Sequence, residues 1–189
     1  MNRLGLTCTS GRLALPVFFD WWKDNASKLS QTKRGDDQNM WRILLIQGAN
    51  MVHLGKREPE FYGSTTASEL DAMLQQHAKS RGYELEIFYT NVEGEAINRI
   101  YRAASEGVNG LVMNPAGFSY SGYALRDCVK GAALPYVEVH MTNVEARGIK
   151  SVMTPVANGV IFGLGTHSYV LGLEAMLHLL SGAKRSEQA

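Results

Sequence analysis

The sequence predicts one α/β domain built on a five-stranded parallel β-sheet with helices on both faces. From residue 41 onward, apolar runs of strand length alternate with amphipathic segments of helix length. The first of these runs has four consecutive aliphatic residues at 43–46, as is typical of strands buried on both sides in parallel sheets. With 189 residues and 45% hydrophobic side chains, the chain is long enough to enclose such a core.

The first strand and the first long helix have clear boundaries. Residues 41–47, WRILLIQ, form a continuous apolar run, so we expect a buried strand there. Thr66 and Glu69 have the spacing of a capping box, which predicts a helix start, and Gly82 is expected to end that helix. Its shared apolar face would consist of Leu70, Met73, Leu74 and Ala78.

The remaining elements repeat the alternation. Further strands are expected at 83–89, 110–115, 135–140 and 159–163, with Pro115 stopping the second of these four. Helices are expected after Asn91 as a cap, at 121–132 and at 168–180. The helix after Asn91 would bury Ile97, Ile100, Tyr101 and Ala104.

Residues 1–39 differ in composition from the rest. Their short apolar run at 13–19 is interrupted by charges well before the length of a membrane span, and no small-residue cleavage site follows it. We therefore interpret 1–39 as an N-terminal extension and 40–189 as the catalytic domain.

Charge and cysteine content exclude several classes of protein. The formal net charge is +1 without a basic stripe, so we expect no nucleic-acid or membrane partner. Cys8 and Cys128 are predicted to be free thiols in a cytoplasmic protein. No His, Cys, Asp and Glu cluster has metal-ligand spacing, and no glycine-rich phosphate motif follows the first strand, so we expect neither a metal nor a nucleotide cofactor.

Polar residues concentrate where the first strand ends, and ligands of parallel sheets bind at that edge. Arg57 and Tyr62 share the loop after the strand, and a nearby guanidinium lowers the pKa of a phenol, which would make Tyr62 a base. The alternative is an exposed arginine and a tyrosine that packs under the loop. Asn50 would either form an Asx turn or hold a catalytic water.

Two later strand ends carry further candidates. Asn114 would either satisfy loop backbone or bind a substrate hydroxyl. Glu138 and His140 alternate along one strand and so point to the same face, where a carboxylate would fix the imidazole tautomer for general acid catalysis. A purely structural ion pair is the alternative.

Four ordered segments resemble the type II 3-dehydroquinate dehydratases, a flavodoxin-like family. GANMVHLGKREPEFYGSTT is similar to the family's signature loop, and three later segments match in order over about residues 41–180: NPAGFSYSGYALRD, PYVEVHMTNVEAR and GVIFGLGTHSYVLGLEA. The resemblance implies a three-layer sandwich and a hydro-lyase without a cofactor. It also implies trimers that assemble into a dodecamer, and a role in aromatic biosynthesis or quinate breakdown.

The resemblance also implies roles for individual residues. Tyr62 would remove the proton alpha to the ketone, Arg57 would keep Tyr62 ionised, and Asn50 would hold a water on the enolate. His140, oriented by Glu138, would protonate the leaving hydroxyl. Asn114 would bind the ring hydroxyls of the substrate, and the backbone of Met141 and Thr142 would bind its carboxylate. Asp127 would reach the site of a neighbouring subunit.

The sequence departs from the family around the substrate. Tyr120 and Gly122 stand where the family usually has His and Ser, and the segment between Arg147 and Pro155 lacks an Arg that Lys150 would have to replace. Two alternatives to 3-dehydroquinate dehydration therefore stay open. One is a related lyase or hydrolase-like enzyme that acts on another cyclic carbonyl compound. The other is a non-catalytic flavodoxin-like binding protein.

Overall fold

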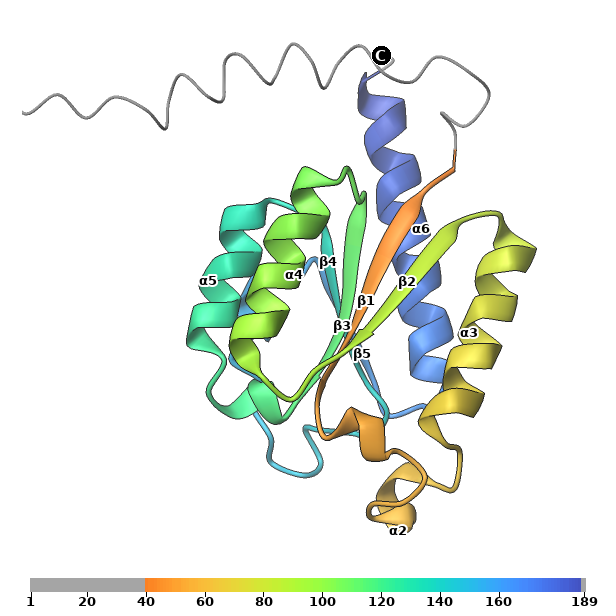
Figure 1. The fold of residues 1–189 in the computed structure, drawn as a ribbon, viewed down its shortest axis with the longest axis vertical. Coiled ribbons are helices and arrows are strands. Elements are labelled where there is room, and N and C mark those ends of the chain that lie inside the picture. The colour runs from red at the N-terminus through yellow and green to blue at the C-terminus, as the bar shows by residue number, and fades with distance from the viewer. Residues whose placement is uncertain (1–39, 188–189) are drawn as a thin grey trace, which may run out of the picture. The chain divides into compact units, whose positions relative to one another are not determined.

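The computed structural model describes residues 40–187 and confirms the predicted α/β fold (Figure 1). Its strands are β1 Arg42–Ala49, β2 Glu84–Tyr89, β3 Gly110–Ala116, β4 Tyr136–His140 and β5 Gly159–Phe162. They form one parallel sheet in the order β2-β1-β3-β4-β5, the order of flavodoxin-like doubly wound folds. Because β2 and β3 flank β1 on opposite sides, a topological switch point lies between β1 and β3.

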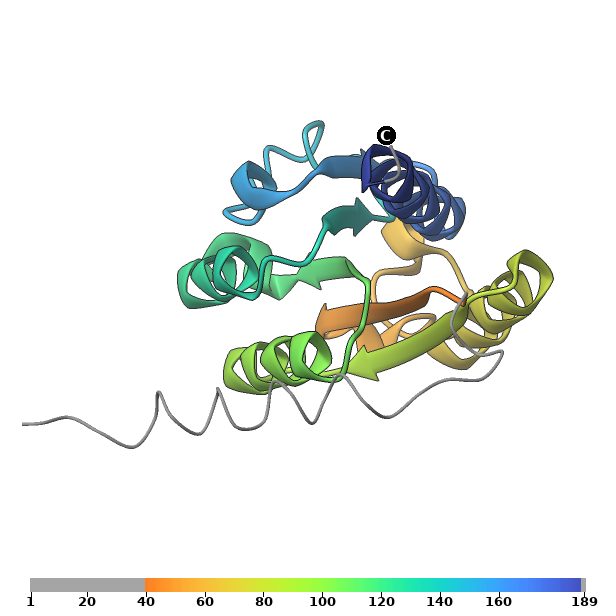
Figure 2. The ribbon, with the colours of Figure 1, turned by 90° about the horizontal axis from the view of Figure 1, so that it is seen from above.

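Helices cover both faces of the sheet and make three layers (Figure 2). One face carries α3 Ala67–Arg81 and α6 His167–Glu187, and the other carries α4 Glu93–Ser105 and α5 Tyr123–Ala132. The short elements are η1 Met51–His53, α2 Pro59–Tyr62, η2 Gly117–Tyr120 and η3 Thr154–Val156. Within residues 40–187 no helix combines the length and apolar character needed to cross a membrane. The predicted extension at 1–39 lies outside the described residues.

The apolar run of β1 supplies both cores of the domain. Ile43 and Leu45 point toward α3 and α6, whereas Leu44 and Ile46 point toward α4 and α5. All four side chains are at most 1% exposed. A strand alternates its side chains between two faces, so only a run without polar interruption can serve a sheet that is covered on both.

Two glycines allow backbones to approach closely. A Cβ at Gly172 would lie 2.3 Å from the Val139 side chain, so its absence lets α6 pack directly on β4. A Cβ at Gly48 would lie 2.2 Å from the carbonyl oxygen of Pro115. The ends of β1 and β3 therefore lie side by side at the switch point.

The predicted boundaries of α3 are confirmed. Thr66 Oγ1 accepts a hydrogen bond from the Glu69 amide, the Glu69 carboxylate accepts one from the Thr66 amide, and Gly82 ends the helix at φ 72°. One predicted core member is wrong, because Met73 is 38% exposed, at the edge of the apolar stripe.

Three other expectations are wrong in detail. Asn91 does not cap α4; Val92 occupies that position, and the Asn91 side chain instead accepts a hydrogen bond from the Asn50 amide at 2.7 Å. Tyr101 is 49% exposed, since it extends from α4 toward α5 rather than into the core. Pro115 does not stop β3, which continues to Ala116. The prediction for Cys128 is confirmed, as it is a buried free thiol.

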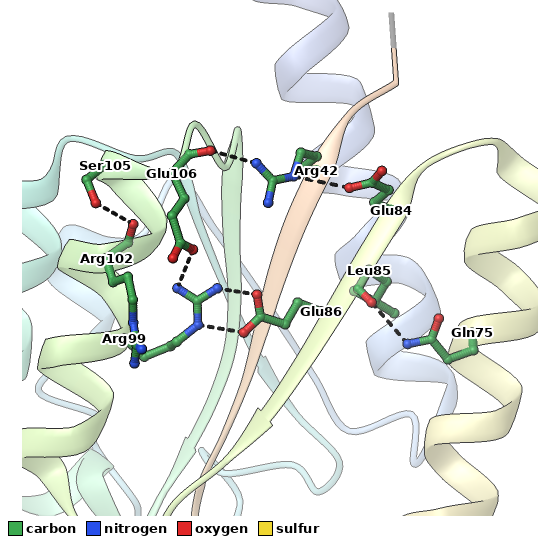
Figure 3. Close-up of polar contacts among 9 residues, drawn as sticks. All are labelled: Arg42, Gln75, Glu84, Leu85, Glu86, Arg99, Arg102, Ser105 and Glu106. Carbon is green, nitrogen blue, oxygen red and sulfur yellow. Dashed lines mark hydrogen bonds and ion pairs between the residues drawn. The ribbon is translucent and has the colours of Figure 1, made fainter. Parts of the chain in front are cut away.

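A group of ion pairs lies toward the other end of the strands, away from the switch point (Figure 3). Arg99 of α4 is buried, and its guanidinium contacts the carboxylates of Glu86 on β2 and Glu106. The bond from Arg99 lowers the pKa of Glu86. Arg42 pairs with Glu84 at 3.1 Å in a more exposed setting. These charges tie α4 to β1 and β2.

Candidate active site

A cavity of about 250 Å³ opens at the carboxyl ends of β1, β3 and β4, beside the switch point. The predicted site residues that line it are Asn50, Arg57, Tyr62, Asn114, Tyr120, His140, Met141 and Thr142. Its other lining residues are Met51, Glu58, Ala116, Gly117, Ser119, Val144, Arg147 and Ile149. Segments far apart in the sequence thus converge on one polar cavity.

A tight turn presents Arg57 and Tyr62 to the cavity. Glu58 adopts φ 40°, Pro59 begins the one-turn helix α2, and Gly63 follows Tyr62 at φ 74°. Arg57 pairs with Glu58 at 2.8 Å, and its guanidinium carbon lies 5.1 Å from the centroid of the Tyr62 ring. The predicted pair is therefore present, with the guanidinium facing the ring of the tyrosine.

The hydroxyl of Tyr62 has a different cationic partner. Arg147 Nη1 donates to the Tyr62 oxygen at 3.2 Å and to Thr142 Oγ1 at 3.0 Å. Its guanidinium carbon lies 4.8 Å from the ring centroid of Phe61, so α2 rests against Arg147. The bond to Tyr62 is the main cause of a raised pKa at Arg147. Two permanent positive charges thus flank one phenol.

A buried carboxylate holds the imidazole of His140, which also lines the cavity. Glu138 Oε1 lies 2.6 Å from His140 Nε2, and Thr154 Oγ1 donates to Glu138 Oε2 at 3.1 Å. Glu138 is fully buried and His140 is 5% exposed. Burial and the nearby Glu138 charge raise the pKa of Tyr136 well above its ordinary range. Because Nε2 faces Glu138, proton exchange with a ligand falls to Nδ1 of His140.

The family profile described as Dehydroquinase class II matches residues 41–177. The 3-dehydroquinate dehydratase of Thioalkalivibrio sulfidiphilus is 43% identical over 143 residues, which cover 74% of this chain and 97% of that protein. The enzyme of the same name from Desulforudis audaxviator is 45% identical over 148 residues, or 77% and 98% of the two chains. The chain belongs to the class II dehydroquinases.

A solved structure gives the same result for this dehydroquinase. The type II dehydroquinase of Butyrivibrio crossotus superposes with a TM-score of 0.71 at 33% identity, over 72% of this chain and 97% of the other. The resemblance found in the sequence is thereby confirmed, and so is the fold class.

Two asparagines of this dehydroquinase line the cavity. Asn50 adopts φ 74° directly after β1, and its amide is held by Asn91. Asn114 is 3% exposed, and its Oδ1 accepts a hydrogen bond from the Ala116 amide at 3.1 Å. Asn114 therefore satisfies loop backbone and also lines the cavity, and its binding of a substrate hydroxyl stays a prediction.

Three predicted residues do not line this cavity, and one of them, Glu138, contacts it through His140. Asp127 of α5 is 73% exposed and lines a separate surface depression with Lys130 and Pro155. Its proposed role in a neighbouring subunit's site stays a prediction. Lys150 is exposed and is not part of the lining, so the expectation that it supplies the site's charge on this segment is wrong. Arg147 supplies that charge instead.

The altered segment after β3 forms one wall. Tyr120 lines the cavity and is 63% exposed. A Cβ at Gly122 would lie 2.7 Å from the carbonyl oxygen of Phe118, so this backbone has no room for a serine at that position. The glycine at position 122 therefore fits the path of the backbone after Phe118.

Arg147 is a site residue that the sequence prediction did not include. A signal for it exists, because Arg147 is the last residue of PYVEVHMTNVEAR, the family-like segment that contains Glu138 and His140. Glu58 and Ser119 had no comparable signal, since acidic and small residues are common in loops. Among residues 40–187 no three His, Cys, Asp or Glu side chains gather as metal ligands.

Proposed function

We propose that this class II dehydroquinase converts 3-dehydroquinate to 3-dehydroshikimate by eliminating water through an enolate. The observation that carries the proposal is the contact of the Tyr62 phenol with both Arg57 and Arg147, in the same cavity as the Glu138-paired His140. An elimination beta to a ketone needs a base and an acid at separate positions. The cavity offers one candidate for each.

Tyr62 is the proposed base. As a phenolate, with Arg147 Nη1 at 3.2 Å from its oxygen, it takes a proton from the carbon alpha to the ketone. The electrons of the broken C–H bond move to the ketone oxygen and form an enolate. Asn50 and a water that it holds stabilise the negative charge by hydrogen bonding.

His140 is the proposed acid. When the enolate re-forms the ketone, the carbon–carbon double bond forms and the beta hydroxyl leaves. The protonated imidazole donates to this hydroxyl, which departs as water, and the Glu138 carboxylate stabilises the charged imidazole. Proton return from Tyr62 to His140 resets the site, so the reaction consumes no cofactor.

Substrate binding is assigned to the groups around Tyr62 and His140. We infer that Asn114 and Tyr120 contact ring hydroxyls and that the backbone amides of Met141 and Thr142 hold the substrate carboxylate, in reach of Arg147. Assembly into trimers and a dodecamer, with Asp127 reaching a neighbouring site, belongs to the same proposal. So does a cytoplasmic location.

The test is turnover of purified protein, followed through the absorbance of the conjugated enone that forms from 3-dehydroquinate. Wild-type protein should be active, and Tyr62→Phe should lose at least about 100-fold in kcat because the phenolic base is gone. The same variant should still bind substrate, since only one oxygen is removed. A Tyr62→Phe protein with most of its activity would rule out this mechanism.

A further inference from the structure

A buried hydrogen-bond relay links the cavity to the interior of the sheet. Asn114 Nδ2 donates to the hydroxyl of Tyr169 at 2.7 Å, and that hydroxyl donates to Gln47 Oε1 at 2.7 Å. The three residues are 3%, 0% and 0% exposed, in this order. They come from β3, α6 and β1, so three separate elements fix one short chain of polar atoms.

The direction of this relay is set by the backbone. The Ala116 amide can only donate, and it donates to Asn114 at 3.1 Å, so the atom facing it must be Oδ1. Nδ2 of Asn114 then faces Tyr169, whose oxygen accepts. The single phenolic proton of Tyr169 is directed to Gln47. Burial raises the pKa of Tyr169, which keeps this proton in place at neutral pH.

The second Nδ2 proton of Asn114 is only weakly engaged. It faces Met51 Sδ at 3.6 Å, and a thioether is a poor acceptor. Met51 and Asn114 both line the cavity. A substrate hydroxyl oxygen is the better acceptor and would displace this contact, provided that the amide keeps its orientation.

We propose that Tyr169 is a positioning residue for substrate binding, which holds the Asn114 carboxamide in the one orientation that presents an N–H to the substrate. The proposal rests on the proposed function, in which Asn114 binds ring hydroxyls. Tyr169 itself does not line the cavity, so it acts through Asn114. Gln47 supports it by accepting the phenolic proton.

Tyr169→Phe tests the proposal with minimal change in shape. We expect KM for 3-dehydroquinate to rise about tenfold, the equivalent of one hydrogen bond, with kcat changed less than about threefold. The matched control is Tyr83→Phe. Tyr83 is also buried, and its hydroxyl hydrogen-bonds His77 at 2.9 Å, outside the active-site cavity. The Tyr83→Phe variant should lose about as much stability as Tyr169→Phe, while its KM stays at the wild-type value.

A double-mutant cycle separates positioning from general loosening of the fold. In an Asn114→Ala background, Tyr169→Phe should raise KM no further, because the group that it positions is absent. Additive effects, or an unchanged KM in the single variant, would overturn the proposal. Gln47→Met should raise KM by a smaller factor, since the phenol then keeps its position but loses its acceptor.

A crystal structure of Tyr169→Phe provides a readout that does not depend on turnover. The Asn114 side chain should rotate away from its contact with the Ala116 amide or occupy two conformers. An unchanged Asn114 would refute the inference even if the enzyme proved to act on another substrate. Absence of wild-type turnover together with a displaced Asn114 would reject the proposed function and retain the positioning role.

Discussion

Nη1 of Arg147 lies 3.2 Å from the phenol oxygen of Tyr62, although 85 positions separate the two residues in the sequence. The contact joins the loop after β1 to the segment after β4, and Thr142 shares the same guanidinium nitrogen. Arg57, which is close in sequence, faces the ring of Tyr62 instead. The arginine that acts on the hydroxyl is therefore the distant one.

This geometry predicts unequal effects of the two arginines. Arg147→Ala should lower kcat/KM more than Arg57→Ala, because Arg147 contacts the Tyr62 hydroxyl itself whereas Arg57 faces the ring. Arg147→Lys should recover part of the loss, as it keeps the charge without the planar fork. The measurement is kcat/KM of the three variants at one pH. A kcat/KM of Arg147→Ala that equals or exceeds that of Arg57→Ala would contradict the assignment.

The Glu138–His140 pair predicts a defect in the acid step. Glu138→Gln removes the negative charge that supports the imidazolium but keeps the size of the side chain, so kcat should fall by about 100-fold with KM little changed. Thr154→Val, which removes only the hydrogen bond to the other carboxylate oxygen, should cost far less. Steady-state kinetics of both variants check this. Equal losses would mean that the pair has only a structural role.

The ion pairs of Figure 3 predict a pH-dependent contribution to stability. Arg99 lowers the pKa of Glu86 below its ordinary value of 4.5, so the folded state favours the ionised carboxylate. This stabilisation is present above about pH 5 and is lost as pH falls through 4.5 and below. Glu86→Gln should therefore lower the free energy of unfolding more at pH 7 than at pH 3.

Urea unfolding at the two pH values measures this difference. Glu84→Gln is the matched control, because Glu84 lies on β2 like Glu86. It pairs with Arg42 of β1, both of these side chains are more exposed, and exposed ion pairs contribute little to stability. A pH dependence for Glu86→Gln that equals that of wild type would show that the Arg99 pair does not stabilise the fold.

The wall after β3 predicts separate outcomes for its two unusual residues. Tyr120→His should lower KM for 3-dehydroquinate without changing Tm, because Tyr120 is exposed in the cavity wall and an imidazole is smaller. Gly122→Ser should lower Tm by several degrees, since its Cβ would collide with the Phe118 carbonyl. A Tyr120→His enzyme with a raised KM would contradict this expectation and show that the phenol binds the ring hydroxyls better than an imidazole does.

The sequence alone determined the elements and one candidate catalytic pair. The apolar run at 41–47, the Thr66 capping box and Gly82 act through neighbouring residues, so their consequences can be predicted locally. Glu138 and His140 belong to the same class, since strand side chains alternate with period two and the pair needs no other segment to meet. The family resemblance added the candidate site residues that lie in the other loops.

Only the tertiary structure decided which groups meet across the cavity. Arg147 reaches Tyr62, and Tyr169 reaches Asn114, from segments whose relative position depends on how β1, β3, β4 and α6 pack. No spacing in the sequence encodes these contacts, because a loop side chain takes its direction from the whole path of the backbone on which it stands. The orientation of Asn114 depends further on one backbone amide at Ala116, a donor that every residue except proline carries and that no sequence pattern marks.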